Sequence, residues 1–182
     1  PSVKNLKQPS LADLDRDGNL EIIVTGSEVF EEGWYGLPCL GIFSHTGKLI
    51  LRKCIGDSGI TSGLGGTPII ANMDDDPDLE IAVMPDGGAF NPVLFYALNM
   101  DGSIVDGFPK GTPDLGFSNV EPVGALDNDG DNEILLNIWG GRTFAWDLQG
   151  EEGIYGWQQF QKEEVHSGIT FEDVPLACID GS

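Results

Sequence analysis

A repeated acidic segment is the feature that most constrains the fold of this chain. Four segments align, with the sequences PSLADLD, PIIANMD, EPVGALD and VPLACID. Their last residues, Asp15, Asp74, Asp127 and Asp180, lie 59, 53 and 53 residues apart. A period of this length indicates tandem supersecondary units, each of which buries its apolar surface against its neighbours.

Each of the first three units reads as four short strands. One apolar segment precedes the acidic loop, and a second follows it, with the sequences EIIV, EIAV and EILL. A hairpin pattern comes later in each unit, in IFSHTGKLI, ALNMDGSIV and AWDLQGEEGIY. Each is an apolar segment, a polar turn with glycine and usually a second apolar segment. No segment has a sustained helical period, and the turns and strand composition exclude helical solenoids.

We therefore predict an all-β fold, a β-propeller fragment with three four-stranded antiparallel blades plus the first strand of a fourth. The whole chain, 1–182, is expected to be a single arc of the ring. Blade 1 is expected at about 8–55, blade 2 at about 66–111, blade 3 at about 119–161 and the start of blade 4 at about 172–182. The remaining blades are expected in the same parent chain or in an assembly.

The acidic loops have the residue pattern of a calcium site. In the first loop, oxygen ligands stand at alternate positions, and Gly18 at position 6 permits a sharp turn. Its expected ligands are Asp13, Asp15, Asp17, Asn19 through its backbone carbonyl, and Glu21. Zinc prefers Cys and His, and magnesium retains its waters, so Ca²⁺ is the expected ion.

The other loops are less complete. The second offers Asn72, Asp74, Asp76, Asp78 and Glu80, but Pro77 replaces the glycine and cannot adopt a positive φ, so its turn must differ. The third offers Asp127, Asp129, Asp131 and Glu133, with Ala125 at position 1. The fourth offers Asp180. Asp, Asn and Gly also dominate ordinary turns, but their recurrence between two apolar strands favours metal sites.

An EF-hand is excluded for the first loop. An EF-hand requires flanking helices and a bidentate Glu at position 12, where this chain has Val24 within a predicted strand.

The net charge argues against two classes of binding partner. Thirty acidic and nine basic residues give a formal charge of −21, which repels nucleic acid and anionic membrane surfaces. No run of about 18 apolar residues is present, so no membrane insertion is expected. A bound divalent cation is the simplest way to offset the self-repulsion.

The acidic loops resemble those of the FG-GAP or VCBS-type repeats, whose blades carry a D-x-D-x-D-G-x-x-(D/E) loop between their first two strands. The segments ADLDRDGNLEIIV and LDNDGDNEILL carry the resemblance, together with the hairpin ALNMDGSIVDGFP. Integrin α-subunit head domains and some secreted polysaccharide lyases have similar blades. The resemblance implies the fold and the calcium more firmly than any ligand or activity.

Two functions follow as expectations. The first is a non-catalytic, calcium-stabilised scaffold for adhesion or recognition of a protein or glycan partner at the blade loops. The alternative is a fragment of a secreted calcium-dependent polysaccharide lyase or another carbohydrate-active enzyme. Extracellular calcium would fill sites that cytosolic calcium leaves empty, so we expect a secreted or cell-surface location.

Cysteines, histidines and aromatic residues give little further evidence about function. Cys39 and Cys54 lie symmetrically about Thr46-Gly47, so a disulfide across a hairpin is conceivable, but a change of one residue in loop length would shift that register. No motif for a nucleophile and its base surrounds His45 or His166. The glycine-rich SGITSGLGG is interpreted as a connection between blades. The tryptophans are expected to pack between blades rather than to stack on sugars.

Overall fold

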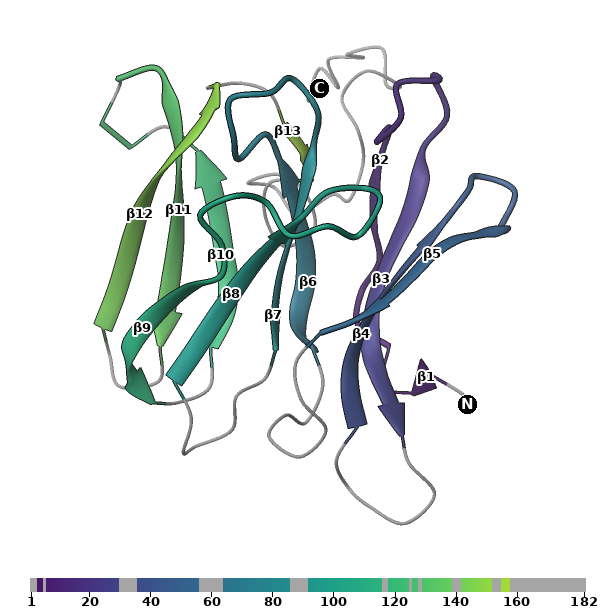
Figure 1. Ribbon diagram of the computed structural model, residues 1–182, viewed down its shortest axis with the longest axis horizontal. Coiled ribbons are helices and arrows are strands. Elements are labelled where there is room, and N and C mark those ends of the chain that lie inside the picture. Colours follow the sequence, from purple (N-terminus) through teal and green to yellow (C-terminus); the bar gives the residue numbers. More distant parts are fainter. Residues whose placement is uncertain are drawn as a thin grey trace, which may run out of the picture.

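The computed structural model confirms the all-β part of this prediction. It describes residues 3–4, 6–29, 36–55, 64–85, 92–115, 118–124, 126–127, 129–138, 142–151 and 155–157. Within these ranges the chain forms thirteen strands and no helix, and the strands pair only in the antiparallel sense. They make three sheets (Figure 1).

Sheet 1 contains the first acidic loop. Its strands are β1 (Val3–Lys4), β2 (Ser10–Ala12), β3 (Glu21–Val29), β4 (Gly36–Phe43) and β5 (Leu49–Cys54). The order is β1-β3-β4-β5, and β2 pairs with the first residues of β3. The acidic loop therefore connects two neighbouring antiparallel strands, as the repeat predicts.

Sheet 2 contains the second acidic loop. Its strands are β6 (Leu64–Ala71), β7 (Glu80–Pro85), β8 (Pro92–Leu98), β9 (Lys110–Leu115) and β13 (Tyr155–Trp157). The order is β13-β6-β7-β8-β9, so β13 closes the sheet from a distant part of the sequence. β6 begins inside the glycine-rich segment that was expected to be only a connection.

Sheet 3 differs from the predicted four-stranded unit. Its strands are β10 (Ser118–Gly124), β11 (Asp131–Ile138) and β12 (Arg142–Glu151), in that order. The hairpin expected in AWDLQGEEGIY does not turn at Gln149-Gly150, because β12 continues through both residues. The next described strand, β13, pairs with Ala71 and Ile70 of β6 instead of β12. The buried backbone at Gly150 lies against the carbonyl of Asn72, a contact that only a residue without a side chain allows.

Sheet 2 lies between the other two sheets. Successive side chains of a strand point to opposite faces, and β6 and β7 use both faces. Ile70 and Ile81 belong to the core shared with sheet 1, whereas Ile69 and Ala82 belong to the core shared with sheet 3. Every residue of β7 is buried. This explains why Ile81, Ala82, Val83 and Met84 are all apolar instead of alternating with polar residues.

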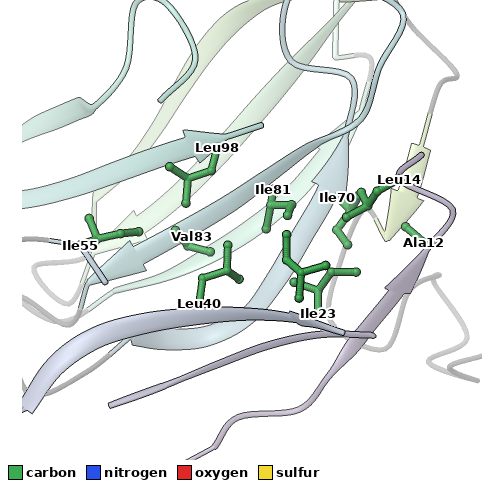
Figure 2. Close-up of a cluster of buried hydrophobic side chains, with 10 residues drawn as sticks. Ala12, Leu14, Ile23, Leu40, Ile55, Ile70, Ile81, Val83 and Leu98 are labelled. Atoms are coloured by element: carbon green, nitrogen blue, oxygen red, sulfur yellow. The ribbon is translucent and has the colours of Figure 1, made fainter. Parts of the chain in front are cut away.

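The core between sheets 1 and 2 is aliphatic. Figure 2 shows side chains of both sheets meeting there, with Ile23 and Leu40 from sheet 1 facing Ile81 and Val83 from sheet 2. Two side-chain hydrogen bonds cross the same boundary. Ser10 Oγ donates to the Pro68 carbonyl (2.6 Å), and Thr25 Oγ1 donates to the Gly66 carbonyl (3.1 Å). These bonds satisfy buried hydroxyl groups and fix β6 against sheet 1.

The hairpin of β4 and β5 carries a disulfide between Cys39 and Cys54. The two residues are direct partners in the register, although the turn is longer than two residues. Ser44 N donates to the Lys48 carbonyl (2.9 Å), which leaves three residues in the loop. A register shift between Ile42 and Phe43 compensates for the extra residue and restores the pairing.

Some of the residues singled out in the sequence lie outside the described residues. The fourth unit at about 172–182, with Cys178 and Asp180, lies outside the described residues, as do Ala125 and His166. His45 is exposed in the turn between β4 and β5. Trp146 packs between sheets 2 and 3 as expected, with its ring centroid 6.1 Å from that of Phe95.

Candidate metal centres

The three acidic loops lie at the same end of the three sheets, at the top of Figure 1. The first loop (13–21) joins β2 to β3, the second loop (72–80) joins β6 to β7, and the third loop (125–133, described except for residues 125 and 128) joins β10 to β11. Each loop therefore connects the first two strands of its unit.

One hydrogen bond closes all three loops in the same way. The backbone N–H at position 2 donates to Oε2 of the glutamate at position 9. The pairs are Leu14 with Glu21 (3.0 Å), Met73 with Glu80 (2.6 Å), and Leu126 with Glu133. One carboxylate oxygen thus holds each loop, and in Glu80 and Glu133 the other oxygen has no partner.

Two further hydrogen bonds order the aspartates. The N–H at position 5 donates to Oδ1 at position 3, and the N–H at position 7 donates to Oδ1 at position 5. The first type joins Asp17 to Asp15, Asp76 to Asp74 and Asp129 to Asp127, and the second joins Asn19 to Asp17, Asp78 to Asp76 and Asp131 to Asp129. All three loops therefore share one backbone frame.

The frame gathers carboxylates in each loop. Oxygens within 4.8 Å of one another come from the sets Asp13, Asp15 and Asp17; Asp74, Asp76 and Glu80; and Asp127, Asp129 and Glu133. Like charges at such separations repel, and a divalent cation bound between them reverses the sign of that interaction. Carboxylate oxygens at this spacing suit a hard cation such as Ca²⁺.

Buried oxygens without partners lie in the second and third loops. Glu80 is fully buried and Glu133 is 6% exposed, yet Oε1 of each accepts no hydrogen bond. Asn72 Oδ1 is also buried without a partner. Buried polar atoms without partners are rare in folded proteins, and an ion is one explanation for them. The glutamates therefore fit a cation in a way that an ordinary turn does not require.

Burial also alters proton affinity. It raises the pKa of Glu80 from 4.5 to about 8, because desolvation outweighs the hydrogen bond from Met73, and the nearby aspartates add to the rise. Burial is likewise the largest cause of the raised pKa of Glu21 and of Asp74. A bound cation would favour the ionised form of each of these groups.

The first loop is closed by backbone N–H groups that donate to its position-1 side chain. Asp13 accepts hydrogen bonds from Asp17 N through Oδ1 and from Gly18 N through Oδ2, each at 3.0 Å. Gly18 has φ of 87°, the left-handed conformation that the sequence predicted for it. Arg16 also has a positive φ, 60°.

The second loop closes differently, as its proline requires. Pro77 has no N–H to offer to position 1, and no residue of this loop has a positive φ. Asn72 stands where the first loop has Asp13, and its Nδ2 donates to the Asp76 carbonyl (2.6 Å). The side chain at position 1 therefore donates to the loop backbone here, whereas in the first loop it accepts from it. Asp78 is exposed and pairs with Arg16 of the first loop (3.5 Å).

The third loop contains a ligand candidate that sequence reasoning missed. Asp147 of β12 groups with Asp129 and Asp131, and all three are exposed. Gly130 has φ of 106°, as a glycine at position 6 predicts. Asp147 lies beside Glu133 in the β11–β12 register, so only strand pairing brings it to the loop. No signal near the loop in the sequence points to it.

No protein-family model, curated protein or solved structure matches this chain. In the part of the chain that the structure describes, no helix has the length and apolar character needed to cross a membrane.

Proposed function

We propose that the chain is a calcium-binding scaffold, in which cations at the acidic loops fasten the first two strands of each unit. One observation carries the proposal. Three loops far apart in the sequence adopt the same hydrogen-bond frame, and in two of them a buried glutamate oxygen, on Glu80 and Glu133, has no protein partner. An ordinary turn needs neither a buried carboxylate nor an unpaired one.

Charge supports the same reading. The formal charge of −21 destabilises a compact chain, and clustered aspartates concentrate the repulsion at one end of the sheets. Each bound Ca²⁺ would remove two units of negative charge where the carboxylates lie closest. The stabilisation would grow with ion concentration, to roughly 2.7 kcal/mol per independent site at one hundred times its dissociation constant.

The arrangement of the sheets supports an arc of propeller blades. β6 contacts β2, β3 and β4 of sheet 1 on one side and β10 of sheet 3 on the other, so neighbouring sheets stack face to face. The outer face of sheet 1 carries an apolar groove of about 330 Å³, lined by Leu6, Val24, Phe43 and Leu49 among others. A propeller covers such a face with another blade.

Location and partner are part of the proposal. The Cys39–Cys54 disulfide is typical of oxidising compartments, where calcium is also abundant. A secreted or surface module with a rigid cation-stabilised frame can present its loops to a protein or glycan. The resemblance to FG-GAP repeats suggests this recognition role, and we propose it without a catalytic step.

Thermal unfolding tests the cation. The purified chain is unfolded in chelator, in 1 mM magnesium and in 1 mM calcium. We expect calcium to raise Tm by about 5 to 10 °C for each tightly bound site, because roughly 2.7 kcal/mol corresponds to such a shift in a chain of this size. Magnesium is expected to have a smaller effect. Equal Tm values in calcium and in chelator would refute the proposal.

A glycan array and a panel of extracellular-matrix proteins test the partner. We expect binding that is lost in chelator and restored by calcium. Cleavage of a uronic-acid polymer by the chain in calcium would instead support the enzyme alternative.

A further inference from the structure

The second loop is held by a side chain of sheet 3. Asn132 of β11 is fully buried, and its Nδ2 donates to the carbonyl of Asn72 and to the carbonyl of Glu151, each at 3.0 Å. Asn72 heads the second loop, and Glu151 ends β12. A single amide of the third unit therefore connects the second acidic loop to the last strand of sheet 3.

Gly150 of sheet 3 makes a second contact with the second loop. Gly150 of β12 is buried against Asn72, and a Cβ at this position would fall on the carbonyl group of Asn72 and close to its Oδ1. The adjoining β13 pairs with the end of β6 at Ala71. Three features of the third unit thus enclose the start of the second loop.

The repeat itself marks Asn132 as unusual. It occupies position 8 of the third loop, where the first and second loops have Leu20 and Leu79. Burial of an amide is unfavourable compared with burial of a leucine unless its hydrogen bonds are made. Both bonds of Nδ2 lead to backbone carbonyls, one of them in the neighbouring unit, while its Oδ1 has no partner. The polar residue therefore serves the contact between units rather than its own loop.

The enclosed loop is also the one with the most buried ligands. Asn72 is 2% exposed and Glu80 is 0% exposed, and Asn72 Oδ1 and Glu80 Oε1 both lack partners. Asn72 determines the loop conformation because its side chain bonds to the Asp76 carbonyl. Any shift of the Asn72 backbone is therefore transmitted to the carboxylates of the loop.

We propose that Asn132 and Gly150 are positioning residues for the second cation site, so that calcium binding at this loop is coupled to the docking of sheet 3 on sheet 2. The proposal rests on the calcium function proposed above. The coupling is reciprocal, because a cation that requires the docked arrangement must stabilise docking by the same factor. The second cation thus fastens two units together, in addition to two strands.

Calcium titration of the full chain tests this. Asp15→Asn and Asp127→Asn together weaken the first and third loops, so that calorimetry reports the second loop. In this background we expect Asn132→Leu to lower calcium affinity about tenfold. Asn137→Leu is the matched control, because Asn137 is an exposed asparagine on the same strand. It should change the affinity by less than about twofold.

The possible failures are distinguishable. In one outcome, the doubly substituted background binds no calcium, and the ions lost relative to the wild type are only those of the first and third loops. The second site then does not exist, and the proposed function fails there. If the background binds calcium, Glu80→Gln abolishes that binding and Asn132→Leu leaves it unchanged, the coupling alone is overturned.

Hydrogen exchange provides a readout that leaves Asn132 intact. Calcium is expected to slow amide exchange in β11 and β12 in the background protein, and this protection should disappear in the same background with Glu80→Gln. Protection of β7 without protection of β12 would overturn the coupling, even if Asn132→Leu failed to fold.

Discussion

The first and second acidic loops share a hydrogen-bond frame but differ in how they close and in what surrounds them. The first loop closes through Gly18, whose N–H bonds to Asp13, and its aspartates at positions 3 and 5 are exposed. The second closes through the side chain of Asn72, and both Asn72 and Glu80 are buried. The same frame is thus built once from local backbone and once from side chains and a neighbouring sheet.

Two residue differences accompany the different closure of the second loop. Pro77 removes the backbone donor that the first loop has at Gly18, and Asn72 contributes a side-chain donor that Asp13 lacks. The exchange is incomplete, because Asn72 Oδ1 is buried without a partner, whereas both carboxylate oxygens of Asp13 accept hydrogen bonds. Both loops nevertheless keep the hydrogen bonds of the shared frame.

Neutralisation of Glu80 should reveal the largest difference between the two loops. In chelator at pH 7, Glu80→Gln is expected to raise the free energy of unfolding by roughly 3 kcal/mol, because each unit of raised pKa corresponds to about 1.36 kcal/mol. The glutamine can still accept from Met73, and its amide N–H groups can donate to nearby aspartates. In calcium the same substitution should destabilise the protein, since a ligand is lost. Denaturant unfolding under both conditions measures the change of sign.

Glu21→Gln in the first loop is the control for that substitution. Its change in chelator should have the same sign and be smaller, because no oxygen of Glu21 is among the buried unpaired atoms of the described residues. An equal effect at both positions would contradict the burial argument.

The pH dependence of stability should follow from the same carboxyl group. The folded pKa of Glu80, about 8, exceeds its ordinary value of 4.5, so the cation-free folded state holds this proton more tightly than the unfolded chain. The stability that this proton gives to the folded state is fully present below pH 4.5 and is lost as the pH rises toward 8. In chelator, the advantage of Glu80→Gln over the wild type should therefore shrink to about 1 kcal/mol or less near pH 5. An advantage that does not change with pH would show that Glu80 is not protonated in the cation-free fold.

A change at position 6 should affect the first loop more than the second. Gly18→Ala is expected to destabilise the protein by roughly 1 to 2 kcal/mol, because a side chain disfavours the left-handed conformation. No atom lies within 4 Å of the added Cβ, so the effect is conformational and not steric. Pro77→Ala is the matched substitution, with a loss of about 0.4 to 1 kcal/mol through the unfolded state. Thermal unfolding in chelator compares the two, and a larger loss at Pro77 would contradict the different closures.

Removal of the ion pair between the two loops should have the smallest effect on the free energy of unfolding. Arg16 and Asp78 form an ion pair whose side chains are 51% and 67% exposed. Arg16→Asn removes the charge and retains a residue that tolerates a positive φ. In a double-mutant cycle with Asp78→Asn, the coupling should be about 0.5 kcal/mol or less and should disappear in high salt. A coupling above about 1 kcal/mol would mean that the pair organises both loops.

The local features of this protein were predictable because they depend on residues close together in the sequence. Alternation of apolar segments with acidic turns predicts the strands on either side of each loop. Gly18 and Gly130 predict their positive φ values, and Pro77 predicts a different turn, since proline and glycine restrict or free the backbone at their own positions. The symmetric positions of Cys39 and Cys54 left their pairing open, because the register depends on a bulge that no local pattern predicts.

Contacts between units were decided by the tertiary structure. Neither the extension of β12 through Gly150 nor the pairing of β13 with β6 follows from the repeat, because both depend on the packing of sheet 3 against sheet 2. Asn132 differs from Leu20 and Leu79 at the same position of the repeat, but its partner, the Asn72 carbonyl, lies 60 residues away. The sequence alone determines where oxygen ligands recur along the chain. Only the packed sheets decide which of those oxygens are buried, since burial depends on neighbours that are distant in sequence.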